Sequence, residues 1–192
     1  MKKFFTLIVA TLMASSMMAQ LHGAMTFAGA SSINVLTQNT GNACDTVRFE
    51  MASMSAGNIT LPVMQGMAAI PSFTIENVAF SKGENHVISI AEQTFTSKVT
   101  VNGEEKNIEG SSISGSYNMA DNSLTLKAVF KYGSMPFDLT YEVKAYYVKP
   151  VASAITVNVG GTFIYGNDGV TYNVRKYIDG NVEKVDVEIP TY

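Results

Sequence analysis

Apolar and polar residues alternate with a period of two along most of this chain, beginning near Ile33. That period is typical of β-strands, because successive side chains on a strand point to opposite faces. Gly- and Asn-bearing turns separate the alternating runs at spacings of about 8 to 12 residues, and no long stretch has a convincing helical period. The pattern predicts an all-β protein, folded as an antiparallel barrel or sandwich.

The clearest hairpin reads SLTLKAVFKY, then the link GSMP, then FDLTYEVKAYYVK. The link suits a tight turn, since Gly133 permits unusual backbone angles and Pro136 opens the next strand. Each strand has one apolar and one largely polar face, and we expect the apolar faces to point inward. Their residues are Leu124, Leu126, Ala128, Phe130 and Tyr132, and, on the second strand, Phe137, Leu139, Tyr141, Val143, Ala145 and Tyr147.

The segment 151–192 looks like a second copy of an earlier one. Val47 and Gly57 are ten residues apart, as are Val170 and Gly180, and both glycines precede an asparagine. The runs INVLTQNTGNACD and ITVNVGGTFIYGND, which lie ahead of these strands, are also alike. We therefore expect one β-barrel domain over 28–149 and a partial second β repeat, the opening strands of a truncated barrel, over 151–192. The alternative is that the tail supplies the closing strands of the first barrel.

The first residues, MKKFFTLIVATLMASSMMAQ, have two lysines ahead of an apolar run and small residues before a plausible cleavage point. This pattern predicts a signal peptide over 1–19 and a mature chain that starts near Gln20. The apolar run is shorter than the roughly 20 residues of a membrane span, so we expect an exported, soluble protein. The destination is the periplasm or the cell exterior.

Cys44 is the single cysteine of the chain. It lies far from the cleavage point, which argues against a lipoprotein, and it has no partner for an internal disulfide. A leftover thiol in an exported chain is either buried or bonded to another molecule, and we expect burial, because a free cysteine behaves as a small hydrophobe.

Without Lys2 and Lys3, the 13 basic residues fall to 11 against 16 acidic ones, a formal net charge of −5 for the mature chain. A net negative charge disfavours nucleic acid and anionic membrane surfaces as partners. Charged residues make up 15% of the sequence, below the roughly 25% of ordinary soluble domains. Exposed faces that are polar but uncharged suit an exported all-β protein.

The stretch SYNMADNSLTLKAVFKYGSMPFDLTYEVKA, with its hairpin YGSMPF, resembles the calycin-like β-barrel family of secreted Bacteroidetes proteins. The N-terminal MMAQ and the segments GNITLPVM and VAFSK agree with that family, so the likeness covers roughly 30–149. It implies a lipocalin-like up-and-down barrel, and members that carry the domain in tandem. Most members lack an assigned activity, so the resemblance transfers no functional residues.

Candidates for catalysis are few. The two histidines, His22 and His86, have no neighbours at metal-ligand spacing, and GSSISG is not a nucleophile elbow. The acidic pairs Glu104-Glu105 and Asp186/Glu188 are more simply a solvated loop and the wet face of a strand than a glycosidase pair. We predict no catalytic residue, metal site or cofactor, and therefore a protein that is not an enzyme.

Aromatic residues on the predicted inner faces are the one suggestive constellation. In an eight-stranded barrel this face either fills with side chains or holds one small ligand. Two functions follow: a carrier of a small apolar molecule, or a cell-envelope interaction or structural module with a packed core and no ligand. The candidate lining residues are Phe130, Tyr132, Phe137, Tyr141 and Tyr147. Separately, Asp45-Thr46-Val47 resembles an O-glycosylation acceptor of exported Bacteroidetes proteins, with Thr46 as the modified residue.

Overall fold

The computed structural model describes residues 23–65, 69–83 and 86–188, and within them the chain forms eleven β-strands. Within these residues, five turns use asparagine or glycine at positive φ to reverse direction tightly, as at Asn102-Gly103 (φ 53° and 83°). The strands are β1 (Met25–Val35), β2 (Gln38–Met51), β3 (Ala56–Leu61), β4 (Phe73–Ala79), β5 (Ser81–Lys82), β6 (Val87–Val101), β7 (Glu104–Asn118), β8 (Ser123–Tyr132), β9 (Leu139–Val159), β10 (Thr162–Asp179) and β11 (Val182–Glu188).

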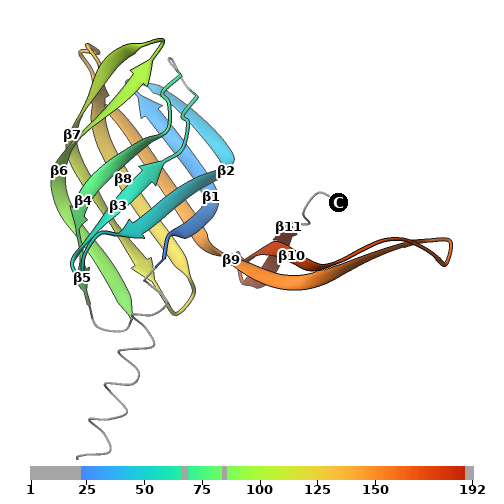
Figure 1. Ribbon diagram of the computed structural model, residues 1–192. Coiled ribbons are helices and arrows are strands. Elements are labelled where there is room, and N and C mark those ends of the chain that lie inside the picture. The colour runs from blue at the N-terminus through green and yellow to red at the C-terminus, as the bar shows by residue number, and fades with distance from the viewer. Residues whose placement is uncertain (1–22, 66–68, 84–85, 189–192) are drawn as a thin grey trace, which may run out of the picture.

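These strands form one antiparallel sheet, which confirms the all-β, antiparallel prediction. Neighbouring strands follow the order β4-β3-β2-β1-β9-β8-β7-β6-β5, and β10 and β11 branch off from β9. The sheet is strongly curved, so that β4, at one end of this order, comes to lie beside β6 near the other end (Figure 1). We refer to β1–β8 together with residues 139–147 of β9 as the main sheet.

The inner face of the main sheet is the hydrophobic core, and its residues have the parity that the sequence predicts. Nine of the predicted inward residues, all on β8 and β9, are buried. Phe137, which precedes β9, and Tyr147 are partly buried and pack against the same core. The Phe130 ring lies between those of Phe73 and Phe95, at centroid distances of 5.4 and 6.4 Å. Such edge-on and tilted contacts are favourable for aromatic rings and fix their positions across the interior.

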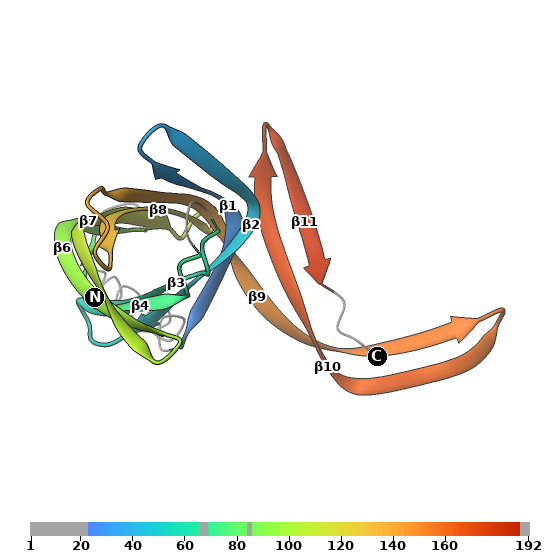
Figure 2. The same ribbon diagram turned by 90° about the horizontal axis from the view of Figure 1, so that it is seen from above.

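β9 continues beyond the main sheet. Its residues 139–147 pair with β1, and 148–159 pair with β10, which in turn pairs with β11. We call 148–188 the C-terminal sheet; Figure 2 shows it beside the main sheet, with β10 nearer to β2 than β11 is. β9 thus runs through the boundary predicted near residue 150, and the C-terminal strands do not lie between β4 and β6.

Two polar contacts join the sheets at this branch. The Arg175 Nη1 donates a hydrogen bond to the Ala28 carbonyl oxygen at 3.0 Å, and the Tyr146 hydroxyl donates one to the Ile178 carbonyl oxygen at 3.3 Å. The Tyr146 and Tyr177 rings also meet, with centroids 6.0 Å apart. The segment 175–178 of β10 therefore packs on β1 and β9 of the main sheet.

Cys44 corrects one prediction, because the structure exposes its side chain. Its neighbours Asp45 and Val47 are buried, and Cys44 has the opposite parity to Asp45 on the same strand. Strand alternation therefore decides its position, rather than the general preference of free cysteine for burial. Its Sγ lies 3.9 Å from the Arg175 guanidinium.

The predicted signal peptide, 1–19, lies outside the described residues. In the part of the chain that the structure describes, no helix has the length and apolarity to cross a membrane.

Leu139 tests the assignment of the core. Its side chain is 3% exposed, so Leu139→Ala should remove buried apolar contacts and lower the free energy of unfolding by about 2 to 5 kcal/mol. Leu36→Ala is the matched control, because Leu36 is 71% exposed and should change stability little. Urea unfolding followed by circular dichroism measures both, and an equal effect of the two changes would contradict the assignment.

Candidate functional site

The candidate site lies where β4 and β6 diverge. β5 follows β4 and pairs with β6, Ser81 opposite Ser89 and Lys82 opposite Ile88. Further along, no backbone ladder joins the described residues of β4 to β6, so each strand presents an edge to the other. Side chains bridge this seam instead.

Gln93 is the first of these bridges. Its Oε1 accepts a hydrogen bond from the Ala79 N–H at 2.9 Å, and its Nε2 donates to the Ala79 carbonyl oxygen at 2.8 Å. A carboxamide offers one acceptor and two donors, so it can imitate the peptide group of a neighbouring strand. The register between β6 and β7 is irregular on both sides of Gln93, which is consistent with its turning toward Ala79.

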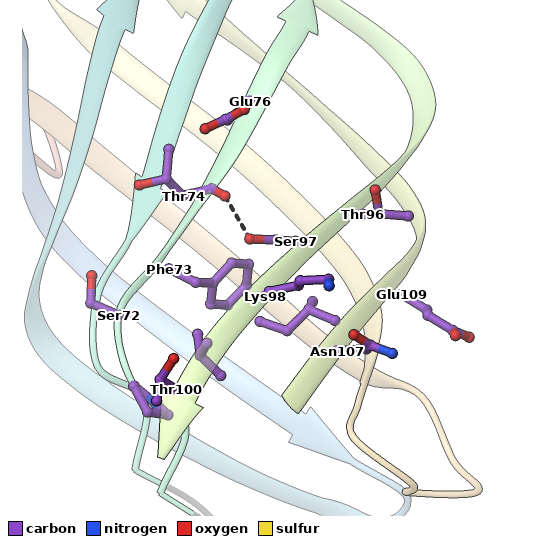
Figure 3. A pocket seen from close by; sticks show the side chains of 13 residues that line it. Ser72, Phe73, Thr74, Glu76, Thr96, Ser97, Lys98, Thr100, Asn107 and Glu109 are labelled. Atoms are coloured by element: carbon purple, nitrogen blue, oxygen red, sulfur yellow. Dashed lines mark hydrogen bonds between the residues drawn. The ribbon is translucent and has the colours of Figure 1, made fainter. Parts of the chain in front are cut away.

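Ser97 bridges the seam a second time, since its hydroxyl donates to the Thr74 carbonyl oxygen at 2.7 Å. Beyond this bond the strands leave a groove with a cavity volume of about 850 Å³ (Figure 3). Its lining combines five hydroxyl side chains and several charged or amide groups with buried apolar residues. The lining residues are Pro71, Ser72, Phe73, Thr74, Glu76, Thr96, Ser97, Lys98, Val99, Thr100, Asn107, Ile108 and Glu109.

Few charged side chains line this groove. Among the described lining residues Lys98 is the one cation, and its Nζ pairs with the Glu105 carboxylate at 2.6 Å. Glu76 and Glu109 are exposed on β4 and β7. With most donors and acceptors neutral, the groove suits a polar, uncharged or weakly charged partner, such as the main chain of an extended polypeptide.

A second polar cluster lies around Asp45, the buried acidic residue of β2, which is 8% exposed. Its carboxylate accepts hydrogen bonds from the Ser31 hydroxyl, the Asn42 amide and, at 3.4 Å, the Tyr141 hydroxyl. Burial, and then the Asp45 carboxylate, raise the pKa of Tyr141. The cluster borders a cavity of about 120 Å³, but its main effect is to join β1, β2 and β9 across the register shift between Gly29 and Ser31.

The residues predicted as ligand lining do not border the groove. Phe130 and Tyr141 are 0% and 1% exposed, and Tyr132 is 8% exposed. Phe137 and Tyr147 are partly buried against the core. Thr46, the predicted glycosylation acceptor, is exposed on β2 and opposite Ala28 of β1, so its hydroxyl faces away from the core.

The sequence analysis did not predict the roles of Asp45 and Gln93. Both positions nevertheless disturb the alternation of apolar and polar residues. Asp45 has the same parity as Val47, so an acid stands at an inward position. On β6 the buried residues change from even numbers at Ile90 to odd numbers at Phe95, which places an irregularity near Gln93. A break in parity marks a bulge, and a polar residue there is free to bond elsewhere.

In the described residues, no three His, Cys, Asp or Glu side chains gather as a metal ion would require. The predicted absence of a metal or cofactor remains a prediction.

No protein-family model matches this chain, and no curated protein matches it. Among solved structures it is similar to the crystal structure of a candidate outer membrane protein from Bacteroides fragilis, with a TM-score of 0.51 and 20% sequence identity. The match covers 66% of this chain and 50% of the other, so this chain spans about half the length of that protein. At this identity the likeness shows the fold alone, an all-β fold shared with a Bacteroidetes protein.

Gln93→Ala should weaken the seam. It removes both hydrogen bonds to Ala79, each worth about 0.5 to 1.5 kcal/mol, so the free energy of unfolding should fall by about 1 to 2 kcal/mol. Amide hydrogen exchange at Ala79 should become faster. The exposed neighbour supplies the control, and Glu92→Ala should leave both measurements unchanged. Unaltered exchange at Ala79 in the Gln93 variant would show that the bridge does not hold the strands.

Two tyrosines that pack in the core, Tyr117, which is partly buried, and Tyr141, which is buried, should make the protein sensitive to alkali. Burial, and then Tyr147 and Asp121, raise the pKa of Tyr117 to about 12 from its ordinary 10.0, and the pKa of Tyr141 is also raised. Both groups hold their protons more tightly when folded, so their contribution to stability is complete below pH 10 and is lost as the pH rises to 12 and above. Urea midpoints across this range should fall less steeply in Tyr117→Phe than in the wild type, and identical slopes would contradict the assignment.

Proposed function

We propose that this chain is an exported, non-enzymatic calycin-like β-barrel that serves as an interaction module of the cell envelope, in the periplasm or outside the cell. In this proposal the interior is packed and holds no small ligand. The partner is an extended segment of another protein, and the groove between β4 and β6 receives it.

The observation that carries the proposal is the near-complete burial of the inner aromatic rings. A void large enough for a ligand would leave its lining side chains accessible to a water-sized probe. Phe27, Phe130 and Tyr141 are at most 1% exposed, and the Phe130 ring meets two other phenylalanine rings. This packing favours the module over a carrier of a small apolar molecule.

The groove adds a second support, because it exposes strand edges. Edge N–H and C=O groups can pair with an added strand, while neighbouring side chains select its sequence. Thr74, Thr96 and Thr100 supply hydroxyls beside these edges, and Phe73 and Val99 form an apolar floor. An extended segment can use both kinds of surface at once.

Native mass spectrometry of the protein purified from its source organism tests the choice of function. The expected mass is that of the mature polypeptide alone, because no small molecule fits the packed interior. A stoichiometric small molecule that remains bound would overturn the proposal and establish the carrier.

Site-specific photo-cross-linking in intact cells tests the groove itself. A benzoylphenylalanine at Thr100, which lines the groove, should cross-link one defined envelope protein, and Ser97→Arg in the same chain should abolish that product. The control position is Arg48, whose side chain is 56% exposed on β2. The same product from Arg48, or persistence of the Thr100 product with Ser97→Arg, would contradict docking in the groove.

A further inference from the structure

We propose that the C-terminal sheet pairs with that of a second copy of this chain, through antiparallel association of the two β11 strands. This surface is separate from the groove between β4 and β6. The proposal rests on the edge of β11 that no described strand covers, on its pattern of charges and on a half-exposed apolar face of the sheet.

The edge comes first. Among the described strands β11 pairs with β10 alone, through seven residue pairs from Asn173 opposite Glu188 to Asp179 opposite Val182. Figure 2 shows β11 on the side of β10 that is away from β1 and β2. No described residue forms a ladder with its outer backbone groups, and such an edge is a template for another strand.

The charges of β11, VEKVDVE, select a second copy and a single register. When two β11 strands run antiparallel and cross at Val185, each Lys184 lies opposite the Asp186 of the other copy. Oppositely charged residues that face each other across strands are stabilising, and like charges are destabilising. This register forms two such pairs and no like-charge pair.

Neighbouring registers of the two β11 strands place like charges opposite each other. A shift of one residue in one direction puts Glu183 opposite Asp186, and in the other direction it puts Glu183 opposite Glu188. A shift of two residues pairs Lys184, or Asp186, with its own counterpart. The sequence of β11 is thus self-complementary in one register, as an interface with two-fold symmetry requires.

Lys184 and Asp186 remain available for this pairing. Within one chain Lys184 pairs with Asp179, and Asp186 pairs with Arg175. Even so, the two side chains are 46% and 49% exposed, and a carboxylate or an ammonium group can serve two partners.

An apolar face of the same sheet also gains from the association. Val185 and Val187 share a face with Val174 and are 52% and 51% exposed. Val174 corresponds to Met51 in the repeat, and Met51 packs on the core of the main sheet. The face that packs on the core in the first copy of the repeat is half-exposed at Val185 and Val187 in the second. Pairing at Val185 places the Val185 side chains of two copies opposite each other, so that each covers part of the other.

Sedimentation velocity of the mature chain, over about a hundredfold range of concentration, should show a monomer and a dimer in exchange. Lys184→Glu alone and Asp186→Lys alone should each weaken dimerisation by about tenfold or more, because both cross-strand pairs become like-charge pairs. An equal mixture of the two variants should restore the dimer, since every pair is again of opposite charge.

The mixture separates the proposal from loss of the contacts within one chain, which each variant breaks and which mixing cannot repair. Lys127→Glu is the matched control, because it reverses a charge in the exposed Lys127–Glu142 ion pair and should leave dimerisation unchanged. A wild-type chain that stays monomeric at every concentration, or a mixture no more dimeric than its components, would overturn the proposal.

Discussion

The burial of one face of a single sheet is the constraint on which this structure depends. Apart from the two-residue β5, each strand of the main sheet carries an apolar face, and no described helix or second sheet covers it. An apolar face of this size cannot remain in water, so the sheet must curve until it covers itself. Phe130 shows the result, because its ring on β8 meets Phe73 of β4 and Phe95 of β6 across the interior.

When the sheet curves over its own apolar face, its two ends meet without regular backbone pairing. Polar side chains join the strands there instead. Gln93 and Ser97 link the backbone of β6 to that of β4 where no ladder forms. Asp45 gathers donors from three strands where β1 and β2 shift register. The polar groups of this fold are thus concentrated where regular pairing fails, and the groove lies beside one of these places.

The alternation of apolar and polar residues made most of the fold predictable. The features that were not predicted lie where this alternation breaks or where it competes with another preference. The alternation around Leu126 and Tyr141 correctly placed both residues inside, because a strand allows only two orientations. Cys44 was expected to be buried on the preference of its residue type, which the strand overrides. The seam at Gln93 depends on how far the sheet curves, a global property that no local pattern contains. The continuation of β9 into the C-terminal sheet was not predicted, because the apparent repeat divides the chain near residue 150 and the pattern of one strand does not show which sheet it joins.

The 21 residues of β9 form a single strand that belongs to both sheets. At about 3.3 Å per residue, such a strand extends roughly 70 Å if straight. β9 bends where it leaves the main sheet (Figure 2), but its backbone is continuous, so a force on the C-terminal sheet reaches the segment 139–147 directly. Ladders with β1 and β8 hold that segment on both sides. The strand is thus a direct covalent connection between the C-terminal sheet and the hydrophobic core, without a separate linker.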